Sequence, residues 1–244
     1  GIIAWKKADN GSEPDGYLIN DKYLENAGTT PGDWYPIALG RLGIQDNNEG
    51  YLAVIKDRVE ERYRESGRLS AAKATEWHRI ALAVLAMGGD PTNFGTDENG
   101  APINLIADGT YDRGKTTPLG RQGINGWIWG LITLDSMRYA VPDGAYNTRD
   151  DIIVEIISKQ LSDGGFALSS DDADPDITAM AITALAPYYN SEKIYSYHRK
   201  ALSADESKTV HEVVDEAVLC LSRLQLDTGD YKSWGTQNVE STDW

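Results

Sequence analysis

The sequence predicts an all-α fold built from repeated pairs of helices, and two observations carry this prediction. The first is a repeat: QLSDGGF, which begins at Gln160, returns as QLDTGDY from Gln225. The second is that apolar residues recur at the 3.6-residue spacing of a helix in most segments between polar turns. Repeats with a period of a few tens of residues are typical of units that bury their apolar faces against one another.

The repeat extends beyond the glycine-rich turn. Asp176-Ile177-Thr178 follows the first copy and Glu240-Ser241-Thr242 follows the second. The offset is 65 residues at the glutamines and 64 at the threonines. A third, weaker echo at 74–82 aligns with 177–185. We therefore expect a helix to open at each acidic position. Because the sequence stops at Trp244, just after the second opening, the chain is expected to be a fragment of a longer protein.

Apolar periodicity, together with Asp, Ser, Thr, Gly and Pro at the segment ends, sets the expected helices. Their ranges are 15–27, 33–43, 49–66, 70–88, 123–140, 148–161, 175–189 and 208–225. In the first half, Ser70 precedes a run of strong helix formers, and Gly88-Gly89 with Pro91 ends that helix. The long segment 89–122 carries Asp-Glu-Asn-Gly and Asp-Gly turn signals, compatible with a small hairpin and a binding surface.

The helix expected at 175–189 has the clearest start. Asp174 fits the N-cap, Pro175 fits the first helical position, where no N–H is needed, and Asp176 places negative charge at the positive end of the helix dipole. Pro187 is expected to finish the helix. Small residues on both of its sides indicate a helix that packs on more than one face, like an inner helix of a ring.

Composition limits the functional classes. The chain has 244 residues, 25% of them charged, and a net charge of -15, which is unfavourable for binding nucleic acid or anionic lipid. It has no apolar run of 18 residues, so no membrane insertion is expected. The single cysteine, Cys220, cannot form an internal disulfide and is expected to be a small buried hydrophobe. We expect one domain over 1–244, compatible with a processed secreted chain.

With these motifs in hand, the sequence resembles the squalene-cyclase/prenyltransferase-like superfamily of α/α toroids. The likeness rests on the glutamine before a Gly-rich turn and on Asp-Pro-Asp-Ile-Thr-Ala, which opens the next helix. It is closest to repeat domains of secreted or surface proteins of Gram-positive bacteria, through Gly32-Asp33-Trp34, Arg41-Leu42-Gly43 and Gly123-Ile124-Asn125. The resemblance implies a complete or partial six-fold α/α barrel, an extracellular or cell-surface location, and further domains in the parent protein.

The same resemblance supplies candidate catalytic residues. Class II terpene cyclases of this superfamily start cyclisation with an Asp-x-Asp-Asp-Thr-Ala motif. Asp174, Asp176, Thr178 and Ala179 match it, but Ile177 stands where the motif has its last aspartate. If the chain is an enzyme, Asp176 is the expected proton donor and Asp174 its modulator. Ile177 offers neither the charge nor the hydrogen bond that keeps such an acid neutral yet strong, which favours the capping role instead.

Other sites receive less support. Prenyltransferases of this fold hold a catalytic zinc through Asp, Cys and His, and the closely spaced Asp-x-Cys arrangement is missing around Cys220. We expect no metal and no cofactor. The candidate ligand-binding residues are five tryptophans, whose rings suit wet pockets and interfaces: Trp34, Trp77, Trp127, Trp129 and Trp234.

Three functional interpretations follow. The leading one is a non-catalytic binding or spacer module that holds a small molecule, a glycan or a protein at the mouth of the ring. The second is a terpene-cyclase-like enzyme that uses Asp176. The third is a small-ligand carrier, because cobalamin-transport proteins of animals use a similar helical ring. A shared fold does not choose among these three.

Overall fold

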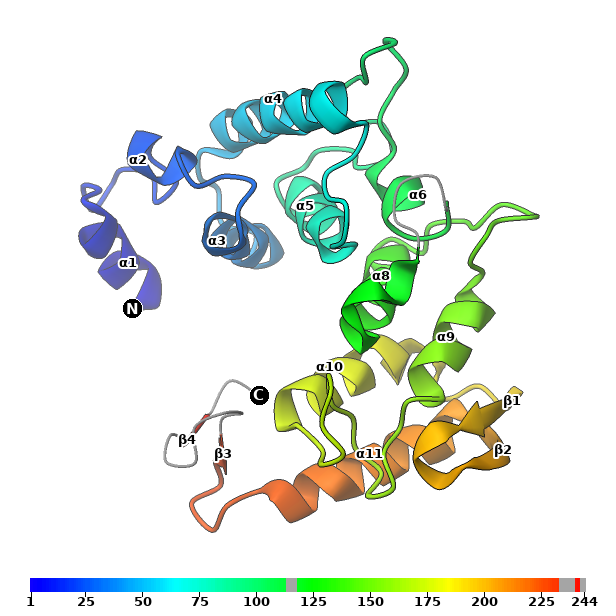
Figure 1. The fold of residues 1–244 in the computed structure, drawn as a ribbon. Coiled ribbons are helices and arrows are strands. Elements are labelled where there is room, and N and C mark those ends of the chain that lie inside the picture. The colour runs from blue at the N-terminus through cyan, green and yellow to red at the C-terminus, as the bar shows by residue number, and fades with distance from the viewer. Residues whose placement is uncertain (113–117, 233–239, 242–244) are drawn as a thin grey trace. The chain divides into compact units, whose positions relative to one another are not determined.

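The computed structural model describes residues 1–112, 118–232 and 240–241. The chain forms two compact units, 1–116 and 117–244, and Figure 1 shows that most of the chain is helical. The predicted helical class is confirmed. In the described residues, strands occur only as two short antiparallel pairs. Each unit is described below by itself.

The first unit contains six described helices. They are α1 (Ile2–Asn10), α2 (Asp21–Leu24), α3 (Thr30–Arg41), α4 (Asn48–Ser66), α5 (Thr75–Ala86) and α6 (Leu105–Gly109). Helix α5 packs against both α3 and α6, and α2 packs against α4. Four side chains of α4, each four residues from the next, form its buried stripe: Tyr51, Ile55, Val59 and Tyr63. This spacing is the apolar face that the sequence predicted for 49–66.

In this unit one helix was missed, and two of the expected helices need correction. Helix α1 was not expected, and the helix expected at 15–27 shrinks to the single turn of α2, which Asn20 caps by accepting a hydrogen bond from the Tyr23 amide. The helix expected from 70 begins at Thr75, because the Ser70 hydroxyl accepts hydrogen bonds from the amides of Ala72 and Lys73 and holds a turn there. Segment 89–122 contains an antiparallel bridge between Thr96 and Pro102, in agreement with a small hairpin, and also α6.

The second unit also has a helical body. The helices among its described residues are η1 (Leu119–Gln122), α8 (Ile124–Asp135), α9 (Arg149–Ile157), α10 (Pro175–Leu185), η2 (Ala186–Tyr188), η3 (Lys200–Leu202) and α11 (Val210–Leu224). Helix α8 packs against α9 and α10, and α10 packs against α11. Thr148 and Thr209 start α9 and α11 with capping boxes. Cys220 is buried on α11, as expected.

Both strand pairs of this unit were missed. Strands β1 (Ile194–Arg199) and β2 (Ala204–Thr209) form a hairpin in which Ile194 pairs with Thr209 and Arg199 with Ala204. Side chains of β1 alternate between exposed and buried, as a strand with one covered face requires. Strand β3 (Tyr231–Lys232) pairs with β4 (Glu240–Ser241). The expectation that Glu240 and Ser241 open a helix is therefore wrong; Thr242 lies outside the described residues.

The repeat at the two glutamines is confirmed in three dimensions. The Gln160 side-chain amide donates to the Gly164 carbonyl at 2.8 Å, and the Gln225 amide donates to the Gly229 carbonyl at 2.7 Å. Gly164 and Gly229 both have φ of 92°, a conformation that favours glycine. The two sequence copies therefore form the same turn, in which the glutamine side chain adds a hydrogen bond to those of the backbone.

Candidate functional site

Asp174, the expected modulator of the candidate acid Asp176, serves as the N-cap of α10. Its Oδ1 atom accepts hydrogen bonds from the backbone amides of Asp176 at 2.8 Å and Ile177 at 3.1 Å. The side chain is buried, with 6% of its surface exposed, and Pro175 follows at the first helical position. Asp176 is half-buried in the first turn of α10. Asp174 Oδ1 therefore serves the backbone at the start of α10, as the capping interpretation expects.

Thr178 of the same motif joins α10 to the glycine-rich turn. Its hydroxyl accepts from the Phe166 amide at 2.9 Å and donates to the Phe166 carbonyl at 3.1 Å. The Asp174 amide donates to the same carbonyl. Gly165 brings the turn close to α11, since a Cβ atom there would lie 2.8 Å from the Cys220 sulfur. The motif thus fastens the turn to α10 and α11 through backbone groups.

The candidate tryptophans that the structure describes differ in burial. Trp34 is exposed on α3, whereas Trp77 on α5 is fully buried and its indole N–H donates to the Tyr63 hydroxyl at 2.8 Å. Trp127 and Trp129 are half-buried on α8, and the Lys159 ammonium lies 5.9 Å from the centre of the Trp127 ring. Trp234 lies outside the described residues.

The first unit contains a buried ion pair that the sequence reasoning missed. Asp33 is fully buried and accepts from Arg79 Nε at 2.8 Å, from the Tyr51 hydroxyl at 2.7 Å and from the Gly28 amide at 2.7 Å. Arg79 also donates to Glu76 at 2.8 and 3.0 Å. Burial raises the pKa of Asp33, and the hydrogen bonds from Arg79, Tyr51 and Gly28 oppose that rise. With its polar atoms engaged, the cluster fastens α3, α4 and α5 together.

His78 is a second buried titratable group that was missed. Its Nε2 lies 2.7 Å from the Gly109 carbonyl, which can only accept, so Nε2 carries the proton of a neutral ring. The other nitrogen, Nδ1, is buried and has no hydrogen-bond partner among the described residues. Burial lowers the pKa of His78 from 6.5 to about 4. In the folded first unit the His78 ring is therefore neutral at physiological pH.

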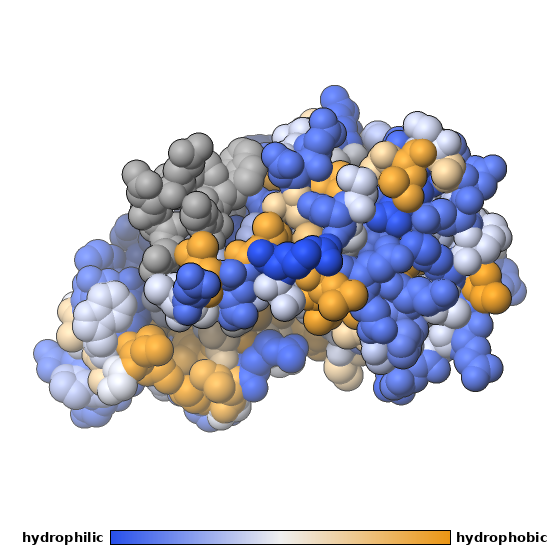
Figure 2. All heavy atoms as spheres, turned by 90° about the horizontal axis from the view of Figure 1, so that it is seen from below, coloured by the Kyte–Doolittle hydropathy of each residue, from blue (hydrophilic) through white to orange (hydrophobic). Residues whose placement is uncertain are grey.

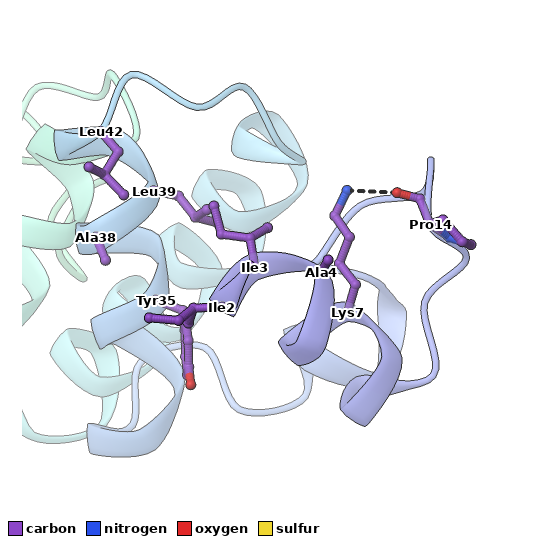
Figure 3. A pocket seen from close by; sticks show the side chains of 10 residues that line it. Ile2, Ile3, Ala4, Lys7, Pro14, Tyr35, Ala38, Leu39 and Leu42 are labelled. Carbon is purple, nitrogen blue, oxygen red and sulfur yellow. Dashed lines mark hydrogen bonds between the residues drawn. The ribbon is translucent and has the colours of Figure 1, made fainter.

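An apolar groove runs between α1 and α3 (Figure 3), with a volume of about 690 Å³. Helix α1 contributes Ile2 and Ile3, α3 contributes Tyr35 and Leu39, and Leu42 lies directly after α3. Lys7 stands at one end, where its ammonium donates to the Pro14 carbonyl at 3.4 Å. Ile2 and Leu42 are more than two-thirds exposed. Such a concave apolar surface suits a ligand with a hydrophobic body.

The view in Figure 2 is mostly hydrophilic, with hydrophobic residues in separate patches. Within the described parts of the chain, none of the helices has the length and hydropathy of a membrane span. In the same parts, no three His, Cys, Asp or Glu side chains are grouped so that they could hold a metal ion. Comparison with family models, curated proteins and solved structures gives no match for this chain. The resemblance to the α/α toroids therefore stays a prediction.

Proposed function

We propose that the chain is a non-catalytic binding module, a toroid-like array of helix pairs within a secreted or surface protein of a Gram-positive bacterium. The toroid and the location rest on the sequence resemblance alone. The observation that supports the non-catalytic assignment is the position of the Asp174 carboxylate, which accepts from the Asp176 and Ile177 amides and caps the helix. In the cyclase interpretation this carboxylate would instead act on the side chain of the proton donor, Asp176.

The fixed positions of the neighbouring groups add support. The Thr178 hydroxyl makes both of its hydrogen bonds with Phe166. Gly165 packs so closely beside Cys220 that a methyl group would not fit without movement. Two polar positions of the cyclase-like motif, Asp174 and Thr178, therefore have structural roles. The binding half of the proposal rests on the α1–α3 groove, whose lining favours an apolar ligand.

A cyclase assay with matched variants tests the non-catalytic assignment. We expect no cyclic product when the protein is incubated with a polyprenyl substrate. Asp174→Ala should lower the free energy of unfolding by about 1 kcal/mol, whereas Asp174→Ser, which can still cap, should cost less. A cyclic product that disappears in Asp176→Asn would overturn the proposal.

The groove is tested with an apolar fluorescent probe, anilinonaphthalene sulfonate. Ala38 lines the groove on α3, so Ala38→Phe should fill part of it and weaken probe binding. Ala53→Phe places the same ring on an exposed position of α4 and is the control. Equal weakening by both variants, or by neither, would count against the groove as the binding site.

A further inference from the structure

A second pocket, in the 117–244 unit, has the chemistry of an anion site. It has a volume of about 440 Å³ and is lined by Asp135, Arg138, Arg149, Pro187 and Tyr188. Asp135 ends α8, Arg138 lies in the turn after it, Arg149 begins α9, and the other two residues belong to η2. Two arginines face one aspartate here, so the lining has one net positive charge within a chain whose net charge is -15.

The aspartate in this pocket is fully engaged by neighbours other than Arg138. Its Oδ1 accepts from Arg149 Nε at 2.9 Å, and its Oδ2 accepts from the Tyr188 hydroxyl at 2.8 Å. Burial and the hydrogen bond to Asp135 raise the pKa of Tyr188, so this hydroxyl remains a donor at neutral pH. Arg149 also donates to the carbonyls of Leu134 and Tyr139 and thereby satisfies the end of α8.

The guanidinium group of Arg138 is available to bind a ligand. Its guanidinium has no hydrogen-bond or ion-pair partner among the residues that the structure describes, and the side chain is exposed at the pocket. An arginine near a helix C-terminus often serves the last carbonyls. At the end of α8, Arg149 performs this task instead. The Arg138 fork is therefore free to meet a planar anion.

The backbone at Arg138 gives an independent indication. Helices α3, α5 and α8 end with the same pair of backbone hydrogen bonds, in which the residue in the left-handed conformation is Gly43, Gly88 and Arg138 respectively. Arg138 has φ of 53° and is one of two described non-glycine residues with positive φ. Glycine is strongly favoured at this position. An arginine placed against that preference, in a pocket, points to a role for its side chain.

We propose that this pocket binds a small monocarboxylate, with Arg138 as the residue that contacts the carboxylate group. One net positive charge matches a single negative charge, and a dianion would also meet the repulsion of Asp135. Pro187 and Tyr188 carry rings that can pack against the body of the ligand. This site goes beyond the proposed function, and its test is independent of the α1–α3 groove and of the cyclase assay.

Titration calorimetry with two probes tests the proposal: benzoate, with an aromatic body, and glucuronate, with a sugar body. Benzyl alcohol and glucose are their neutral controls. We expect saturable binding of at least one carboxylate. The probe that binds shows whether the pocket prefers a ligand with an aromatic body or one with a sugar body. Arg138→Gln should weaken binding by about tenfold or more, because it removes a charged hydrogen bond. Arg64→Gln, at an exposed position on α4, should leave binding unchanged.

A second variant separates binding from folding. Arg138→Gly should abolish binding yet raise the midpoint of thermal unfolding by about 2–4 °C, because glycine relieves the left-handed backbone. Absence of binding by both probes, equal binding of the neutral controls, or preference for inorganic phosphate would overturn the proposal. So would Arg138→Gln binding like wild type, or a loss of stability in Arg138→Gly.

Discussion

Acidification should destabilise the first unit through one residue, His78. The folded state keeps this ring neutral down to about pH 4, because burial opposes its charge, whereas the unfolded chain takes up the proton near pH 6.5. Between these values the unfolded state binds more protons, so stability falls as the pH falls and is unaffected above 6.5. At 1.36 kcal/mol for each pH unit, about 3 kcal/mol is lost by pH 4, of which about 2 kcal/mol is already lost by pH 5.

Urea unfolding of wild type and His78→Gln at pH 7 and pH 5, followed by tryptophan fluorescence, measures this effect. Glutamine can still donate to the Gly109 carbonyl but does not titrate in this range. The wild type should lose about 2 kcal/mol more than the variant between the two pH values. A proton NMR titration of the ring gives the pKa directly. Equal pH dependence of the two proteins, or a His78 pKa near 6.5, would refute the reasoning.

Two further predictions concern the Asp33 cluster and the Thr178 hydroxyl. Arg79→Met should lower the free energy of unfolding by about 3–5 kcal/mol, because it leaves the buried Asp33 carboxylate without its ion-pair partner. Adding Asp33→Asn should recover part of that loss, and no recovery would show that the ion pair is not the cause. Thr178→Val should lower the free energy of unfolding by about 1–3 kcal/mol, because the Phe166 amide loses its acceptor. Thr183→Val, at an exposed position of the same helix, should lower it by less than about 0.5 kcal/mol. Similar losses in the two variants would contradict the assigned role of the Thr178 hydroxyl.

The sequence was most informative where structure depends on neighbouring residues. Asp174 and Pro175 begin α10 as expected, because a cap needs only the side chain and the amides two and three residues later. The two glutamine turns also follow from a short motif, since each glutamine reaches a carbonyl four residues away. Helix periodicity found α4 nearly to the residue, and burial of Cys220 followed from the apolar run around it.

The sequence was least informative where partners are far apart in the chain. Asp33 and Arg79 are 46 residues apart, and nothing in either segment alone marks them as a pair. Strand β1 alternates exposed and buried side chains, but its sequence, IYSYHR, mixes polar and aromatic residues without a clear apolar period. What stabilises it is distant: Arg199 of β1 donates to the Gln160 carbonyl at 3.0 Å. Tertiary contacts of this kind override local preference.

The same contrast bears on where function is to be sought. In the motif that stood out in the sequence, the side chains of Gln160, Asp174 and Thr178 form hydrogen bonds with backbone atoms. Arg138, which no motif marked, combines a left-handed backbone with a guanidinium that has no partner among the described residues. A motif that repeats in a sequence marks the residues that every repeat needs in order to fold. A ligand site is instead expected where one element differs from its counterparts, as the end of α8 differs from the ends of α3 and α5 in having arginine in place of glycine.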